Sequence, residues 1–181
     1  MDARLYHLQT EAERVTATTT DLALIRELHR DKMALYLRHI AVARLVSDYE
    51  FNNAYQYVIN REDMHLRWLE SAITEFGGEP DTVAPPTVRA GGAKTPGNND
   101  AFMPLVAEDA AGCRGFVNKW RPRNAEIKSD RHRKLVGVLL GETVEAERFF
   151  NQVTEGRDDL LGRRMPGAST GDGVMSVRWV E

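Results

Sequence analysis

The chain has 181 residues, of which 42% are hydrophobic and 28% are charged, a length and composition that suit one globular domain. The net charge of −3 provides no overall positive field for nucleic acid or anionic lipid, and the single cysteine, Cys113, excludes a disulfide within the chain. No uncharged apolar run reaches the roughly 18 residues of a membrane span, and the start does not read as a secretory signal. We therefore expect a soluble, cytoplasmic protein.

The first half of the chain carries two long stretches with apolar residues at helical spacing. A short leading helix is expected within residues 1–19, and the first long helix runs from Leu22 to Val46. The second long helix runs from Asp48 to Phe76 and ends at two glycines. Residues 79–100 then contain four of the seven prolines, which excludes a regular helix and predicts a long crossover.

The second half of the chain repeats this pattern of two helices. The third helix begins near Ala101, and Pro122 kinks or ends it. The fourth begins near Ser129 and runs to about Glu155. The last residues, 162–181, are predicted to be a flexible tail, so that residues 1–161 form a single domain with its helical core in 22–156.

The order of these elements is hairpin, long crossover, hairpin. A crossover of this length lets the chain return to the same end of a bundle before the second hairpin starts. We therefore predict an all-α fold, an up-down-down-up four-helix bundle with one long crossover between helices two and three.

Charged side chains interrupt the apolar stripes of all four predicted helices. Glu62 and His65 form a Glu-x-x-His motif on the second helix, one turn apart on the same face. On the fourth helix, Glu142 and Glu145 lie between two apolar positions of the stripe. The full set of candidate metal ligands is Asp31, Glu62, His65, Asp109, Glu142 and Glu145.

Buried carboxylates at these positions would need neutralisation. An unpaired buried carboxylate is very costly, and five that face one another would also repel. Two divalent cations would supply four positive charges and would use the carboxylate oxygens as ligands. Because carboxylates with one imidazole suit iron or manganese better than zinc, we predict two Fe ions, or two Mn ions, as cofactors.

The spacing of the acids is consistent with such a site. Asp31 and Glu62 are 31 residues apart (62 − 31), and Asp109 and Glu142 are 33 apart (142 − 109). At a rise of ~1.5 Å per residue, the chain returns to the same level after about 15 residues up one helix and about 15 down the next. Two neighbouring acids remain alternatives, Glu27 for the first helix and Glu108 for the third.

The stretch from Asn60 to Glu70, with the exit turn Phe76–Pro80, resembles the second helix of the ferritin-like superfamily, which includes rubrerythrins, bacterioferritins and related di-iron carboxylate proteins. The resemblance extends over about residues 22–153. It implies one acid each from helices one and three and a Glu-x-x-His from each of helices two and four. Matched position by position, these are Asp31, Glu62 with His65, Asp109 or Glu108, and Glu142.

Three positions depart from the family pattern. Glu145 stands where the family usually has histidine, and Asp31 and Asp109 stand where it has glutamate. An intact site implies a metal-binding di-iron or di-manganese oxidoreductase or ferroxidase acting with O₂ or peroxide, with Glu62 and Glu142 as bridging acids. The departures keep open an alternative, a non-catalytic ferritin-like binding or assembly module with a degenerate metal site.

The expected partners follow from the same residues. Tyr55, Tyr57 and Trp68 on the second helix exceed what one bundle readily buries, which suggests a homodimer. The basic run in residues 121–134 also contains acids, so it is interpreted as a solvated turn and nucleic acid is not an expected partner. No membrane partner is expected.

Overall fold

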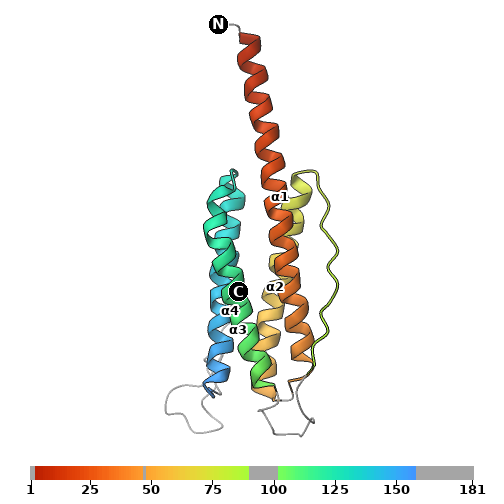
Figure 1. Ribbon diagram of the computed structural model, residues 1–181, viewed down its shortest axis with the longest axis vertical. Helices are drawn as coiled ribbons and strands as arrows, with labels where there is room; N and C mark the ends of the chain where they lie inside the picture. Colours follow the sequence, from red (N-terminus) through yellow and green to blue (C-terminus); the bar gives the residue numbers. More distant parts are fainter. Residues whose placement is uncertain (1–2, 47, 90–101, 158–181) are drawn as a thin grey trace, which may run out of the picture.

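The computed structural model describes residues 3–46, 48–89 and 102–157, without the side chains of residues 3–17 and Glu50. These ranges contain four long helices and no strand, so the predicted all-α class is confirmed (Figure 1). The helices are α1 (Ala3–Ala43), α2 (Tyr49–Glu75), α3 (Met103–Arg123) and α4 (Asp130–Thr154), with a short 3₁₀ turn, η2 (Asn124–Glu126), before α4. The predicted tail, 162–181, lies outside the described residues.

Local signals explain both ends of α2. Asp48 caps α2 by accepting a hydrogen bond from the backbone N–H of Phe51 at 3.0 Å. At the other end Gly77 adopts a φ of +76°, a conformation that favours glycine and ends the helix. The leading helix expected in residues 1–19 is not separate, because α1 is continuous from Ala3. Residues 3–43 contain no glycine or proline that would interrupt it.

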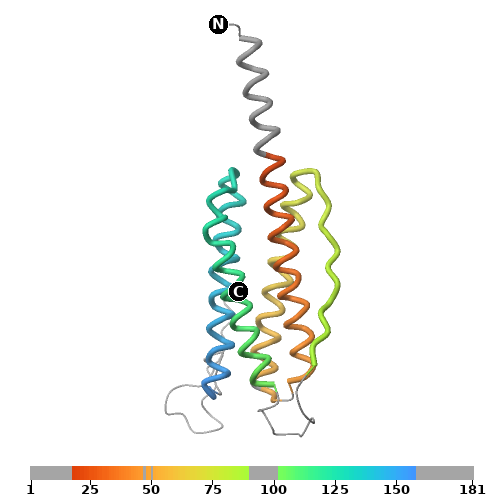
Figure 2. Tube along the Cα trace, in the orientation of Figure 1, coloured from red at the N-terminus to blue at the C-terminus, as the bar shows by residue number. Residues whose placement is uncertain are grey.

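The two hairpins are joined by an extended strap, residues 77–89, which runs back along α1 (Figures 1 and 2). Asp81 on this strap accepts hydrogen bonds from Arg26 and from Arg30, the latter at 2.7 Å. The strap lets α3 begin at the same end of the bundle as α2. The remainder of the predicted crossover, 90–100, is not described.

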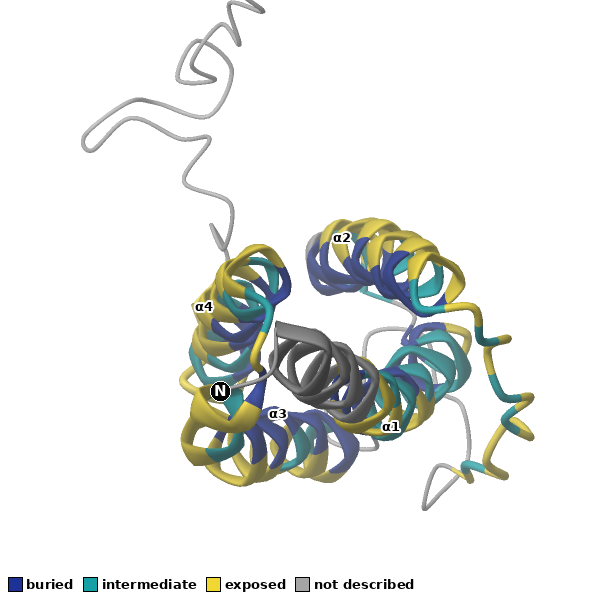
Figure 3. Ribbon diagram, turned by 90° about the horizontal axis from the view of Figure 1, so that it is seen from above, coloured by how far each residue is buried: buried dark blue, intermediate teal, exposed yellow. Residues whose placement is uncertain are grey.

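The helices form a bundle in which packing is uneven. α1 packs against both α2 and α3, and α3 packs most extensively against α4, whereas α2 and α4 meet along a looser seam (Figure 3). Two apolar clusters fill the two ends of the bundle. One contains Val58 and Phe150, and the other contains Leu28 and Leu139. Between these clusters, α1, α2 and α4 pass through a short layer with buried polar side chains, among them Lys32, Glu62 and Thr143.

Asp21 joins α1 to the start of α4. Its side chain is 2% exposed and accepts backbone hydrogen bonds from Lys128 at 2.8 Å and Ser129 at 2.9 Å. We expect Asp21→Ala to lower the free energy of unfolding by about 2 kcal/mol, because two N–H groups lose their acceptor. Urea denaturation measures this. Asp130→Ala, at a side chain that is 77% exposed, is the control and should change stability little; equal losses in both variants would contradict this role of Asp21.

Candidate functional site

The polar layer between the two apolar clusters is centred on Glu62 of α2. Lys32 of α1 donates from Nζ to Glu62 Oε1 at 2.7 Å, and Nδ1 of His39, also on α1, lies 2.7 Å from Oε2. All three side chains are buried. Lys32 Nζ also lies 3.2 Å from the hydroxyl of Thr143 on α4. Each oxygen of this buried carboxylate therefore has its own nitrogen partner within the chain.

The charges of this trio stabilise one another. Burial alone would raise the pKa of Glu62, but the positive charges of His39 and Lys32 outweigh it and lower the pKa to about 2. Burial alone would lower the pKa of His39, but the charge of Glu62 and the neighbouring thiol of Cys113 raise it to about 10. At neutral pH the interior thus holds an ionised carboxylate between an ammonium and an imidazolium.

His65, one turn after Glu62, differs from His39 because its imidazole is uncharged. Its side chain is 3% exposed, and burial, with a further contribution from Lys32, lowers its pKa to about 4, so the imidazole is neutral. Nε2 lies 3.9 Å from an oxygen of Glu142. Nδ1 has no hydrogen-bond partner among the described residues. This is a buried polar atom that the surrounding protein does not satisfy.

A small cavity adjoins His65 at the seam between α2 and α4. Its volume is about 20 Å³, room for one water molecule. Four of the six predicted ligands line this cavity, together with the two cationic side chains Lys32 and Arg61. These four are Glu62, His65, Glu142 and Glu145. The structure therefore brings together the candidates from helices two and four.

The two acids from α4 are already paired beside this cavity. Glu142 accepts two hydrogen bonds from the guanidinium of Arg61 across the seam, and Glu145 pairs with Arg148 on its own helix. The buried face of α4 passes through Thr143, one position after Glu142. Thr143 is buried, whereas Val138, one turn before Glu142, is 52% exposed. Glu142 and Glu145 consequently lie at the edge of the bundle and not at its centre.

Asp31 lies outside the cavity, on the side of α1 that faces α3. It accepts hydrogen bonds from the indole N–H of Trp120 and from Lys119, both at 2.7 Å. Its alternative, Glu27, pairs with Arg123 at 2.7 and 2.8 Å and with Lys119 at 2.9 Å. On α1 it is therefore Lys32, and neither of these acids, that reaches the cavity.

Asp109 is buried, as predicted, but it belongs to a different group. It accepts hydrogen bonds from the hydroxyl of Tyr55 at 2.5 Å and from Nε of Arg38 at 2.6 Å. Burial raises the pKa of both Asp109 and Tyr55. Its alternative, Glu108, is exposed and accepts a hydrogen bond from Arg38 at 2.8 Å. Neither acid of α3 lines the cavity at the α2–α4 seam.

These side chains, as arranged, do not fit a pair of metal ions. Each predicted acid already has a basic partner, and two cationic groups, Lys32 and Arg61, face the cavity where a metal would bind. Within the described ranges, no three or more His, Cys, Asp or Glu side chains are grouped so that they could hold a metal ion. The two-metal site remains a prediction from the sequence, without support from the donor set.

Sequence reasoning missed the basic members of the site, Lys32 and His39. The signal was present, because Leu28, Lys32, Leu35 and His39 follow the spacing of a single helical stripe. Lys32 and His39 occupy interior positions of this stripe but are basic, whereas the predicted ligands are mainly acids.

Comparisons with models of protein families, with curated proteins and with solved structures give no match. The ferritin-like resemblance therefore rests on the sequence motifs and the helix order alone. Among the helices described, none is long and apolar enough to cross a membrane.

Proposed function

We propose that this chain is a ferritin-like four-helix bundle that acts as a non-catalytic binding or assembly module in the cytoplasm. The observation that carries the proposal is the fully buried contact between Lys32 Nζ and Glu62, at 2.7 Å. In this proposal the protein's own ammonium and imidazolium groups neutralise the interior acid that a metal would otherwise neutralise. The helix order, with one strap between two hairpins, supports the ferritin-like arrangement.

Energetics favour this arrangement over one with a bound metal. Removing an ion from water costs several kcal/mol even after the protein relaxes, so Lys32 is tolerated in the interior because Glu62 pairs with it. A metal that took Glu62 as a ligand would leave the ammonium buried without its partner. The affinity of a metal for this site is reduced by that cost. A second copy of the chain is the partner that the exposed faces of Tyr57 and Trp68 suggest.

Metal content tests this proposal directly. Protein produced in medium supplemented with Fe and Mn should contain far less than one metal ion per chain by elemental analysis. Its melting temperature should be unchanged by Mn(II), or by Fe(II) without oxygen, because a ligand raises the melting temperature only if it binds the folded state. Stoichiometric metal together with a higher melting temperature would overturn the proposal.

A second candidate is the metal-binding oxidoreductase that the sequence suggests. The observation in its favour is that Glu62, His65, Glu142 and Glu145 line one cavity. Lys32 and Arg61 would have to turn away before these groups could act as ligands. The same measurement separates the two candidates. If metal is found, its loss in His65→Ala, with retention in the surface variant Glu155→Ala, would assign it to this cavity.

A further inference from the structure

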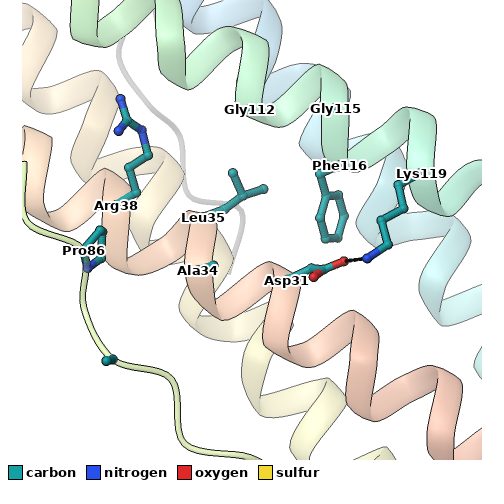
Figure 4. A pocket seen from close by; sticks show the side chains of 10 residues that line it. Asp31, Ala34, Leu35, Arg38, Pro86, Gly112, Gly115, Phe116 and Lys119 are labelled. Carbon is teal, nitrogen blue, oxygen red and sulfur yellow. Dashed lines mark ion pairs between the residues drawn. The ribbon is translucent and has the colours of Figure 1, made fainter.

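An open groove lies between α1 and α3, on the side of the bundle where the strap passes (Figure 4). Its volume is about 480 Å³, which is within the range of small-molecule sites in proteins. Ala84 and Pro86 of the strap form one edge. Asp31 and Arg38, which mark its two ends on α1, are seven residues apart (38 − 31), so the groove is roughly 10 Å long.

The middle of this groove is apolar and its ends are charged. Leu35 of α1 and Phe116 of α3 point into it, and Gly112 and Gly115 leave its α3 wall low (Figure 4). The charged lining residues are Asp31, Arg38 and Lys119, and each of the two cations is paired with two acids at the edge of the groove. This pattern matches a molecule with an apolar body and one anionic end that takes the place of an acid at one of these cations.

Among the described residues, nothing in the packing requires glycine at position 115. Glycine inside a helix destabilises it relative to alanine. Gly112 differs, because a Cβ there would lie 3.2 Å from Cδ2 of Leu35. A Cβ at position 115 would meet none of the described residues within 4 Å. A side chain at this position would start in open space at the wall of the groove, and glycine keeps this part of the groove open.

The two ends of the groove differ in their capacity to accept an anion. Arg38 is held between Asp109 and Glu108, so that end has two acids against one cation. At the other end, Lys119 is 44% exposed and shares its acids with other donors. If Lys119 turned to a ligand, Asp31 would keep the indole of Trp120 and Glu27 would keep Arg123. Lys119 can therefore exchange partners at a low cost.

We propose that this groove binds an aliphatic monocarboxylate, with its chain along Leu35 and Phe116 and its carboxylate at Lys119. The inference rests on the proposed function, since it names a ligand class for the binding module. The apolar walls take the hydrocarbon out of water, and the ammonium forms a charge-assisted hydrogen bond with the carboxylate.

Decanoate is the probe for this site. Calorimetric titration should show binding to the full chain, and decanoate should raise the melting temperature. Decylamine, which has the same chain and the opposite charge, should not do so. Lys119→Met should weaken binding of decanoate about tenfold, the effect of losing one hydrogen bond to a charged group.

Two glycine variants separate the groove from the general stability of the helices. Gly115→Leu fills the groove and should abolish decanoate binding. Gly141→Leu on α4 is the matched control: a Cβ there also meets none of the described residues within 4 Å, so both variants gain helix propensity, but Gly141 lies away from this groove. The control should bind decanoate as the native chain does.

Three results would overturn the inference: no binding of decanoate, equal binding of decylamine, or undiminished binding by Gly115→Leu. None of these results depends on whether the protein contains metal, so none of them tests the proposed function. Conversely, a bound metal would overturn the proposed function and leave the decanoate result as it stands. Failure of the groove and failure of the proposed function are therefore distinguishable.

Discussion

Replacing Lys32 by methionine is expected to lower the free energy of unfolding by about 3 kcal/mol. Removing one partner of a buried ion pair leaves the other charge uncompensated, a change that typically costs ~3–5 kcal/mol. We expect a loss at the lower end of this range because His39 still contacts the second oxygen of Glu62. Urea denaturation at pH 7 measures the loss, with circular dichroism to confirm that the variant remains helical.

Two further variants make this test specific to the buried pair. Lys119→Met removes a lysine of similar reach from its partly exposed ion pairs with Asp31 and Glu27, and it should cost at most about 1 kcal/mol. The double variant Lys32→Met, Glu62→Leu removes both charges and should recover most of the stability, as apolar replacement of buried pairs commonly does. If Lys32→Met were as stable as Lys119→Met, Lys32 would not neutralise the interior as we propose.

Much of the fold followed from local signals in the sequence. Gly77 and the prolines that follow ended the second helix where expected, and Asp130 is the first residue of the fourth. These features act over a few residues, so they can be recognised without knowledge of the tertiary structure. The continuity of α1 was missed because an absence of glycine and proline is a weaker signal than their presence.

The candidate site was predictable only where a helix had one unambiguous inner stripe. Glu62, His65 and Asp109 are buried as expected. On α1 and α4 the inward residues are Lys32 and Thr143, each one position after the predicted acid. A shift of one residue turns a side chain by about 100° around a helix, which is enough to move an acid from the interior to the edge of the bundle.

Charge partners that come from other helices could not be predicted at all. Arg61 of α2 meets Glu142 of α4, and Lys119 of α3 meets Asp31 of α1, because of how the four helices are rotated in the bundle. Apolar periodicity gives a helix its inner face but leaves its rotation open by tens of degrees. The sequence therefore shows that basic residues are present at these positions, but it does not show which acids they neutralise.

The pH dependence of stability should carry the signature of two buried histidines with opposite shifts. His65 faces Lys32 of α1, Glu142 of α4 and, on its own helix, Arg61 and Glu62. Its folded pKa of about 4 lies below the ordinary 6.5, so the unfolded state binds the proton first. Stability should then fall as the pH drops from about 6.5 to 4, by up to about 1.4 kcal/mol per pH unit.

His39 should govern the other side of the profile. It faces Glu62 of α2 and Cys113 and Asp109 of α3, and its folded pKa of about 10 lies above 6.5. The stability that its positive charge contributes is complete below pH 6.5 and is lost as the pH rises toward 10. The two histidines together predict maximal stability near pH 6.5.

Single substitutions can assign the acid limb and the alkaline limb of the pH–stability profile to one histidine each. In urea denaturation from pH 4 to 10, His65→Leu should flatten the acid limb and leave the alkaline limb unchanged. His39→Gln should do the reverse, whatever either change does to stability at its maximum. An acid limb in His65→Leu that runs parallel to the native one would show that His65 is not held neutral. In that case the lack of a hydrogen-bond partner for Nδ1 of His65 among the described residues would need a different explanation.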